Sequence, residues 1–245
     1  MDVSPLRGAV GFLTRLPVET TEDDWRAMTA NVWTFPVVAY AIGLVAAVPL
    51  ALELPGPTAA IVYVALIFLV TGINHADGLA DLGDGAVVHG GPERRRSVMK
   101  DTTVGVGGIV ALGLGLAGLV AGAVLLTALP VVVGLGLAVA AEVGAKLGMV
   151  TLAVRGRPSH DGLGAQLLGA AGRNEWLGLG VALPVVLVAP PATAAAVVAG
   201  PVVALALRRW AHANLGGVGG DVFGATNELA RVVALHAGVV VWTLS

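Results

Sequence analysis

The stretch VGVGGIVALGLGLAGLVAGAVLL at Val104–Leu126 contains no charged residue, and PVVVGLGLAVAAEVGAKLGMVTLAV at Pro130–Val154 follows it closely with only Glu142 and Lys146. A helix needs about 20 apolar residues to cross the hydrocarbon core of a membrane. Both stretches meet that length. They predict two neighbouring transmembrane helices joined by a short turn.

Similar apolar runs extend over most of the remaining chain. They are Val32–Leu52, Pro57–Ile73, Trp176–Ala189, Pro191–Leu207 and Leu229–Leu244. The sequence therefore predicts an all-α fold: a polytopic integral membrane helical bundle of about seven transmembrane helices, forming a single domain over residues 1–245. The fifth run in chain order, Trp176–Ala189, is short and contains Pro184, so six spans are the alternative.

The composition excludes several other classes of protein. The 245 residues are 56% hydrophobic and 12% charged, whereas soluble domains carry about 25% charged residues. A soluble enzyme of this composition could not cover its surface. The chain has no cysteine, which excludes a disulfide-stapled secreted domain. Its net charge of -2 gives no sign of a nucleic-acid partner.

The charged residues gather in the segments between alternate apolar runs. All Lys and Arg except Lys146 lie in the N-terminal arm, in the loops 74–103, 155–175 and 208–228, or at the start of the last span. Such an excess of basic residues marks the cytoplasmic side of a membrane protein. We expect a multi-pass protein of the cytoplasmic membrane whose polar loops and active site face the cytoplasm.

The most informative polar segment is NHADGLADLGDG at Asn74–Gly85. Asp77, Asp81 and Asp84 follow an i, i+4, i+7 spacing, which places three carboxylates on one face of a helix. Because like charges at this spacing repel, either a cation lies among them or the segment stays well solvated. The first alternative is favoured, since Mg²⁺ prefers such carboxylate oxygens together with substrate phosphates. His75 lies just before these aspartates. It could act as a base, donate a hydrogen bond to a phosphate or bind a metal ion.

Basic and glycine-rich segments follow. Arg94–Lys100 ends in a lysine that could hold a phosphate, and Asp101 comes directly before the next span, where it could cap the helix or add a carboxylate. Five glycines surround Asp221 in Gly216–Glu228, a composition that suits either phosphate binding or a hinge. Glu142 and Lys146 are expected to pair inside the membrane and to line a cavity.

Together these motifs resemble cobalamin synthase, the membrane adenosylcobinamide-GDP ribazoletransferase family. The resemblance rests on five segments: Gly11–Val18, the aspartate motif His75–Gly85, the Met-Lys-Asp motif Met99–Gly105, Gly162–Gly164 and Gly216–Glu228. It implies Mg²⁺-dependent phosphoryl transfer from adenosylcobinamide-GDP to α-ribazole or its 5′-phosphate, with release of GMP. The lipid bilayer is the other expected partner, and a homo-oligomer is left open.

The motifs and the resemblance together give the candidate site. Catalytic roles are predicted for His75, Asp77, Asp81, Asp84 and Lys100, with Asp77, Asp81 and Asp84 as the Mg²⁺ ligands. Substrate-binding roles are predicted for Arg15, Arg96, Asp101, Arg157, Gly217, Asp221 and Glu228.

Two other functions are weighed against this one. A membrane CDP-alcohol phosphotransferase acting on lipid has a similar aspartate motif, Asp-Gly-x-x-Ala-Arg, but the corresponding segment of this chain, which begins Asp77-Gly78-Leu79-Ala80-Asp81, contains no Arg. A transporter would place acidic residues along its path. Here the acids concentrate at one face, and transport is therefore the least favoured alternative.

Overall fold

The computed structural model describes residues 2–170 and 175–245, and within them it is helical apart from turns, loops and one isolated bridge. The all-α prediction is confirmed. The helices are α1 Ser4–Leu13, α2 Glu22–Ala30, α3 Thr34–Ala47, η1 Val48–Ala51, α4 Gly56–Thr71, α5 Asn74–Val87, α6 Pro92–Met99, α7 Val106–Thr127, α8 Val131–Arg155, α9 Leu163–Ala170, α10 Glu175–Val186, α11 Ala192–Asn214 and α12 Gly220–Leu244.

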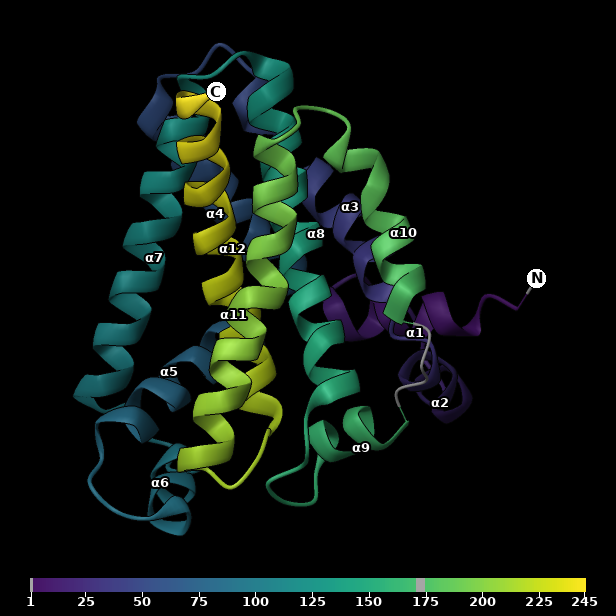
Figure 1. The fold of residues 1–245 in the computed structure, drawn as a ribbon, viewed down its shortest axis with the longest axis vertical. Helices are drawn as coiled ribbons and strands as arrows, with labels where there is room; N and C mark the ends of the chain where they lie inside the picture. The colour runs from purple at the N-terminus through teal and green to yellow at the C-terminus, as the bar shows by residue number, and fades with distance from the viewer. Residues whose placement is uncertain (1, 171–174) are drawn as a thin grey trace.

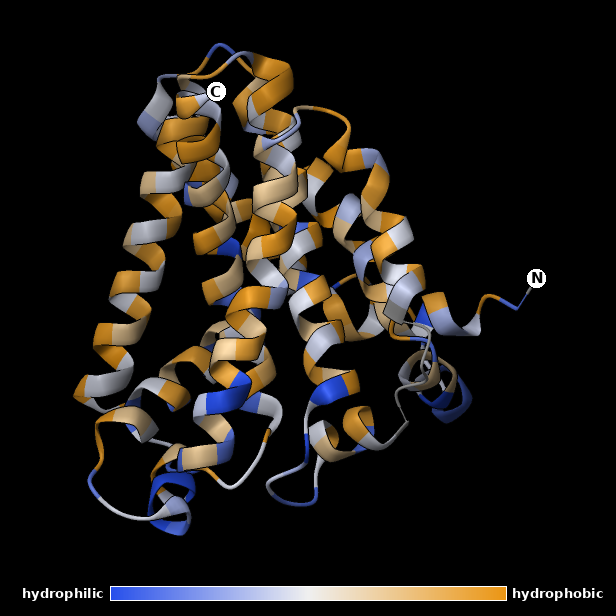
Figure 2. Cartoon of the chain, in the orientation of Figure 1, coloured by the Kyte–Doolittle hydropathy of each residue, from blue (hydrophilic) through white to orange (hydrophobic). Residues whose placement is uncertain are grey.

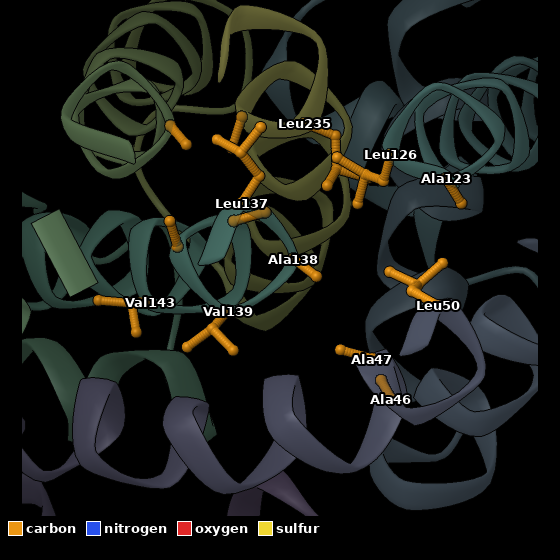
Figure 3. Close-up of a cluster of buried hydrophobic side chains, with 14 of the residues drawn as sticks. Ala46, Ala47, Leu50, Ala123, Leu126, Leu137, Ala138, Val139, Val143 and Leu235 are labelled. Carbon is orange, nitrogen blue, oxygen red and sulfur yellow. The ribbon is translucent and has the colours of Figure 1, made fainter. Parts of the chain in front are cut away.

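Helix α8 is the centre of an upright bundle, in contact with α3, α10, α11 and α12 (Figure 1). Small residues allow these helices to approach closely, as is usual for helix packing in membranes. A Cβ atom added to Gly200 of α11 would lie 1.7 Å from the carbonyl oxygen of Gly144 of α8. Figure 3 shows the apolar cluster that fills one part of this core, with Leu137 and Val143 of α8 facing other buried side chains.

Four helices of the described residues are long and apolar enough to cross a membrane: α3 with η1, α7, α8 and α11. A fifth span results if α4 and α5, which are bent by 98° at their junction, count as one. The polytopic membrane fold is thus supported, but the predicted number of about seven exceeds this count. The difference arises because α10 has only 12 residues and α12 carries charged and polar residues along its first half.

The sharp bend between α4 and α5 positions the aspartate motif. Gly72 ends α4 with a φ of 73°, a left-handed conformation that glycine adopts without strain. The chain then turns so that α5 lies across the end of the bundle, in contact with α7 and α12 (Figure 1). We therefore treat α5 as lying outside the spanning helices.

Hydrophilic residues gather at the end of the bundle where α5, α6 and α9 lie, whereas the C-terminus lies at the opposite end (Figure 2). The loops predicted to share one face of the membrane do meet at this polar end. Residues 171–174 of the predicted loop 155–175 lie outside the described residues. The cytoplasmic orientation of the polar end stays a prediction.

Candidate functional site

Helix α5 carries the three aspartates of the predicted site, and the residues around them are small. Gly78 lets α12 approach α5 so closely that an added Cβ would lie 2.8 Å from the carbonyl oxygen of Asp221. This crossing brings Asp221 of the glycine-rich segment next to Asp77 and Asp81. The predicted i, i+4, i+7 helix is confirmed, since α5 covers all three of its aspartates.

Two carboxylates at this crossing, those of Asp81 and Asp221, have raised pKa values. Burial, followed by the charge of Asp221 and those of the neighbouring aspartates on α5, raises the pKa of Asp81 to about 7. Burial also raises the pKa of Asp221, while the charges of His160 and Lys100 act in the opposite direction. The site therefore has an excess of negative charge that a bound cation would relieve.

Asp84 has a different environment from the other two aspartates of α5. Its Oδ2 accepts a hydrogen bond from the backbone N–H of Gly105 at 2.7 Å, and its Oδ1 accepts one from Gly108 at 2.8 Å. Asp84 is buried and caps the N-terminus of α7. Asp101, for which capping was one prediction, instead accepts bonds from the N–H and hydroxyl of Thr103 in the turn before α7.

Among the described residues, no group of three or more His, Cys, Asp or Glu side chains is arranged to hold a metal ion. Mg²⁺, however, takes one or two carboxylates and completes its shell with water and substrate phosphates. Asp77, Asp81 and Asp221 supply hard oxygen donors of that kind. The predicted metal role of Asp77, Asp81 and Asp84 stays a prediction, and Asp84 already uses both oxygens for the cap.

A narrow pocket joins the acidic crossing to the basic segment of α6. It is lined by Arg96, Met99, Lys100, Ser159, His160, Leu215, Gly219, Asp221 and Val222. Three predicted residues, Arg96, Lys100 and Asp221, thus come together from separate loops. Ser159 and His160 were not predicted, and the Ser159 Oγ lies 2.8 Å from His160 Nδ1.

The neighbouring arginines of α6 have separate contacts. Arg95 donates to the carbonyl oxygens of Gly85 at 2.7 Å and Ala86 at 3.0 Å, and so satisfies the C-terminal end of α5. Arg96 donates instead to the carbonyl oxygen of Leu215, which fixes the basic segment to the loop before α12.

The loops that contain Arg157 and Gly217 pair with each other. The N–H of Val218 donates to the carbonyl oxygen of Arg157 at 2.7 Å, and the N–H of Ser159 donates to Val218 at 3.2 Å. A Cβ on Gly217 would lie 2.6 Å from the same Arg157 oxygen, so this glycine is needed for the pairing. The Arg157 side chain itself is exposed.

Arg15 lies against the bend from which α5 begins. Its N–H donates to the carbonyl oxygen of Val70 at 2.7 Å, and its Nε would lie 2.7 Å from a Cβ on Gly72. Gly72 therefore needs its lack of a side chain as well as its positive φ. The arginine is exposed beside the start of the aspartate motif.

Glu228 belongs to a buried ionic network below α5. Arg231 donates from Nη1 to Glu228 at 2.6 Å, and its Nε and Nη2 both bond Glu142 of α8. The Nζ of Lys146 lies 3.2 Å from Oε2 of Glu142. The predicted Glu142–Lys146 pair is confirmed, and two carboxylates and two cations balance in this network, as buried charges require.

Asn227 connects this network to His75. Its Oδ1 accepts from Lys146 at 2.7 Å, and its Nδ2 lies 3.0 Å from Glu228 Oε1 and 3.2 Å from His75 Nδ1. Gly224 permits the approach, because a Cβ there would lie 2.9 Å from the His75 carbonyl oxygen. His75 is partly exposed.

Asn227, Ser159 and His160 were not predicted as members of the site, and no partner was predicted for Arg231. The i, i+3 spacing of Glu228 and Arg231 at the start of the predicted last span was a signal for a buried pair. Nothing in the local sequence indicated that Ser159 and His160 would meet Asp221, since that contact depends on the pairing of two loops.

The fold and the site define a polytopic helical membrane protein with clustered carboxylates and basic side chains at its polar end. The chain belongs to the cobalamin-5-phosphate synthase family, whose model matches residues 5–239. The family resemblance inferred from the motifs is thereby confirmed.

Its relatives include proteins named adenosylcobinamide-GDP ribazoletransferase. One from Halorubrum lacusprofundi is 46% identical, with 99% of each chain covered. One from Halobacterium salinarum is 54% identical over 78% of this chain and 97% of its own. One from Haloquadratum walsbyi is 42% identical over the full length of both. No solved structure matches the chain.

Proposed function

We propose that the chain is a transferase that joins adenosylcobinamide-GDP to α-ribazole or its 5′-phosphate and releases GMP, in the assembly of the nucleotide loop of cobalamin. Family membership supports the activity. The single structural observation that carries the site is the crossing of α5 and α12, where burial and the charge of Asp221 raise the pKa of Asp81, beside a pocket lined by Lys100 and Arg96.

The reaction is a displacement at phosphorus. A hydroxyl oxygen of the acceptor attacks the corrinoid-side phosphorus of the diphosphate, and the bond to the bridging oxygen breaks in line. GMP leaves with that electron pair, and the hydroxyl proton is released. Such a reaction asks the protein mainly for positioning and for stabilisation of negative charge.

Mg²⁺ is proposed as the cofactor, and when bound it would neutralise charge on the diphosphate. Asp77 and Asp81 are its proposed ligands, with Asp221 within reach of the same cluster. Asp84 was the third predicted ligand, and its two bonds to the start of α7 favour a positioning role instead.

The chain's own cations are proposed to hold the diphosphate. Lys100 is exposed at the end of α6 and Arg96 lines the same pocket. Arg15, at the bend before α5, is proposed to contact the substrate from the other end of the helix. The side-chain contacts of Asp101 and Glu228 support positioning roles, because they already stabilise a turn and the buried network. The side chain of Arg157 is exposed and is proposed to contact the substrate.

The polar end is proposed to face the cytoplasm, with the bundle in the cytoplasmic membrane. This orientation follows from the basic residues of the polar loops. The bilayer and the two substrates are the proposed partners, and an association of several copies is left open.

Purified protein in detergent or vesicles tests the proposal directly. We expect GMP and the joined corrinoid to form from adenosylcobinamide-GDP and α-ribazole in equal amounts, and only with Mg²⁺ present. A parallel reaction with a CDP-activated alcohol and a lipid acceptor is the control for the alternative class. Turnover of that pair, with none of the corrinoid, would contradict the proposal.

A further inference from the structure

A chain of polar contacts leads from the buried network to the histidine of the aspartate motif. Lys146 contacts Asn227, and Asn227 contacts His75. The histidine ring can carry its single neutral-state proton on either nitrogen, and its hydrogen-bond partner decides which one. The contacts of Asn227 therefore bear on what His75 can do.

Two charged neighbours fix the orientation of the Asn227 amide. The Lys146 ammonium is only a donor, so the atom 2.7 Å from it is the amide oxygen. The Glu228 carboxylate is only an acceptor, because it also receives a bond from Arg231, so the atom 3.0 Å from it is the amide nitrogen. The two assignments agree with each other.

The second N–H of that amide group is then left for His75 Nδ1, which lies 3.2 Å away. To accept this bond, Nδ1 must have a free lone pair. In the neutral ring the proton must consequently be on Nε2. A charged imidazolium has protons on both nitrogens, so its Nδ1–H would face the amide N–H of Asn227 and no hydrogen bond could form between them.

We propose that Asn227 is a positioning residue that holds the His75 ring with Nδ1 as the acceptor of its amide N–H, so that the Nε2–H of the ring is the group left to donate a hydrogen bond to the reacting diphosphate. The assignment of the tautomer rests on geometry alone. The assignment of its use rests on the proposed function.

The tautomer is measurable without any activity. Protein labelled with ¹⁵N-histidine has five histidines, and the signal of His75 is identified by its loss in His75→Gln. We expect a protonated Nε2 and an unprotonated Nδ1 in the resting enzyme. A protonated Nδ1, alone or in an imidazolium, would overturn the proposal.

Asn227→Asp tests whether Asn227 causes this state. A carboxylate accepts a bond, so we expect the proton of His75 to move to Nδ1 and kcat to fall at least tenfold with KM for adenosylcobinamide-GDP nearly unchanged. Asn214→Asp is the matched control, because its amide nitrogen donates to the carbonyl oxygen of Trp210. An unchanged His75 spectrum in Asn227→Asp would refute the positioning role.

Two replacements of His75 separate donation from proton acceptance. Gln keeps an N–H near the position of Nε2, whereas Leu keeps only bulk. We expect His75→Gln to retain at least tenfold more turnover than His75→Leu, and equal losses would argue against donation. Should a variant fail to fold, the wild-type spectrum still decides the tautomer. Absence of transferase activity in the wild type would instead count against the proposed function.

Discussion

Replacement of Asp84 by Asn distinguishes a helix cap from a metal ligand. Asp84 accepts bonds from the N–H groups of Gly105 and Gly108 at 2.7 and 2.8 Å. Hydrogen bonds to a charged group contribute about 1.5–3 kcal/mol each. Asn keeps one acceptor but turns its NH₂ group toward the other donor, so one bond and the helix-dipole interaction are lost. We expect the free energy of unfolding to fall by about 2–3 kcal/mol.

The assay is thermal unfolding of the purified protein in detergent, followed together with turnover as a function of Mg²⁺ concentration. For soluble domains of this length, a change of 2–3 kcal/mol lowers Tm by roughly 4–12 °C. For Asp84→Asn we expect such a loss, with a half-saturating Mg²⁺ concentration within about threefold of wild type, since a cap does not touch the ion.

Asp81→Asn is the matched comparison on the same helix. Asp81 has a pKa raised to about 7 by burial and by the neighbouring carboxylates, so removal of its charge relieves repulsion. We expect its Tm to be equal to or above that of wild type, and its turnover to fall at least a hundredfold, as loss of a transition-state contact does. The opposite pattern, with Asp84→Asn stable but dependent on much more Mg²⁺, would refute the cap.

Three further predictions address charge, topology and packing. Lys100→Met should lower kcat at least tenfold, whereas Arg94→Ala, at an exposed position of the same helix, should change it less than threefold; similar effects would make Lys100 part of a general basic surface. His89→Cys in the loop after α5 should not react with an impermeant thiol reagent outside intact cells, and labelling there would contradict the orientation. Gly200→Ala should lower stability by about 1–3 kcal/mol in thermal unfolding, because its Cβ would lie 1.7 Å from a carbonyl oxygen of α8. Gly180→Ala, with no atom near that Cβ, is its control.

Local patterns in the sequence sufficed for the helices and for the acidic face. The spacing of Asp77, Asp81 and Asp84 alone predicts a shared face, and α5 has it. Hydropathy likewise predicts α7 and α8 within a few residues of their ends. Both features depend only on residues that are close together in the chain. They can therefore be predicted from the sequence.

Features that depend on contacts between residues far apart in the chain could not be predicted from the sequence. The sequence placed Asp84 with the metal ligands because its spacing is that of a helical face, but the cap of α7 depends on how Gly105 packs against α5. Glu228 was assigned to substrate on its motif, yet its partner Arg231 also reaches Glu142, 89 residues away in the chain.

Burying the ionic network below α5 costs free energy, so a contribution to stability alone does not explain why the network is present. Removing charges from water costs several kcal/mol per ion, and well-packed apolar side chains often replace such a network without loss. What apolar residues would not supply is the directed contact from Asn227 to His75, and the common anchor of α8 and α12 through Glu142 and Arg231. Because α12 also carries Asp221 to the acidic crossing, any slip of α12 against α8 would move a carboxylate of the site. We therefore interpret the network as the part of the bundle that keeps α12 in register with α8 near the polar end.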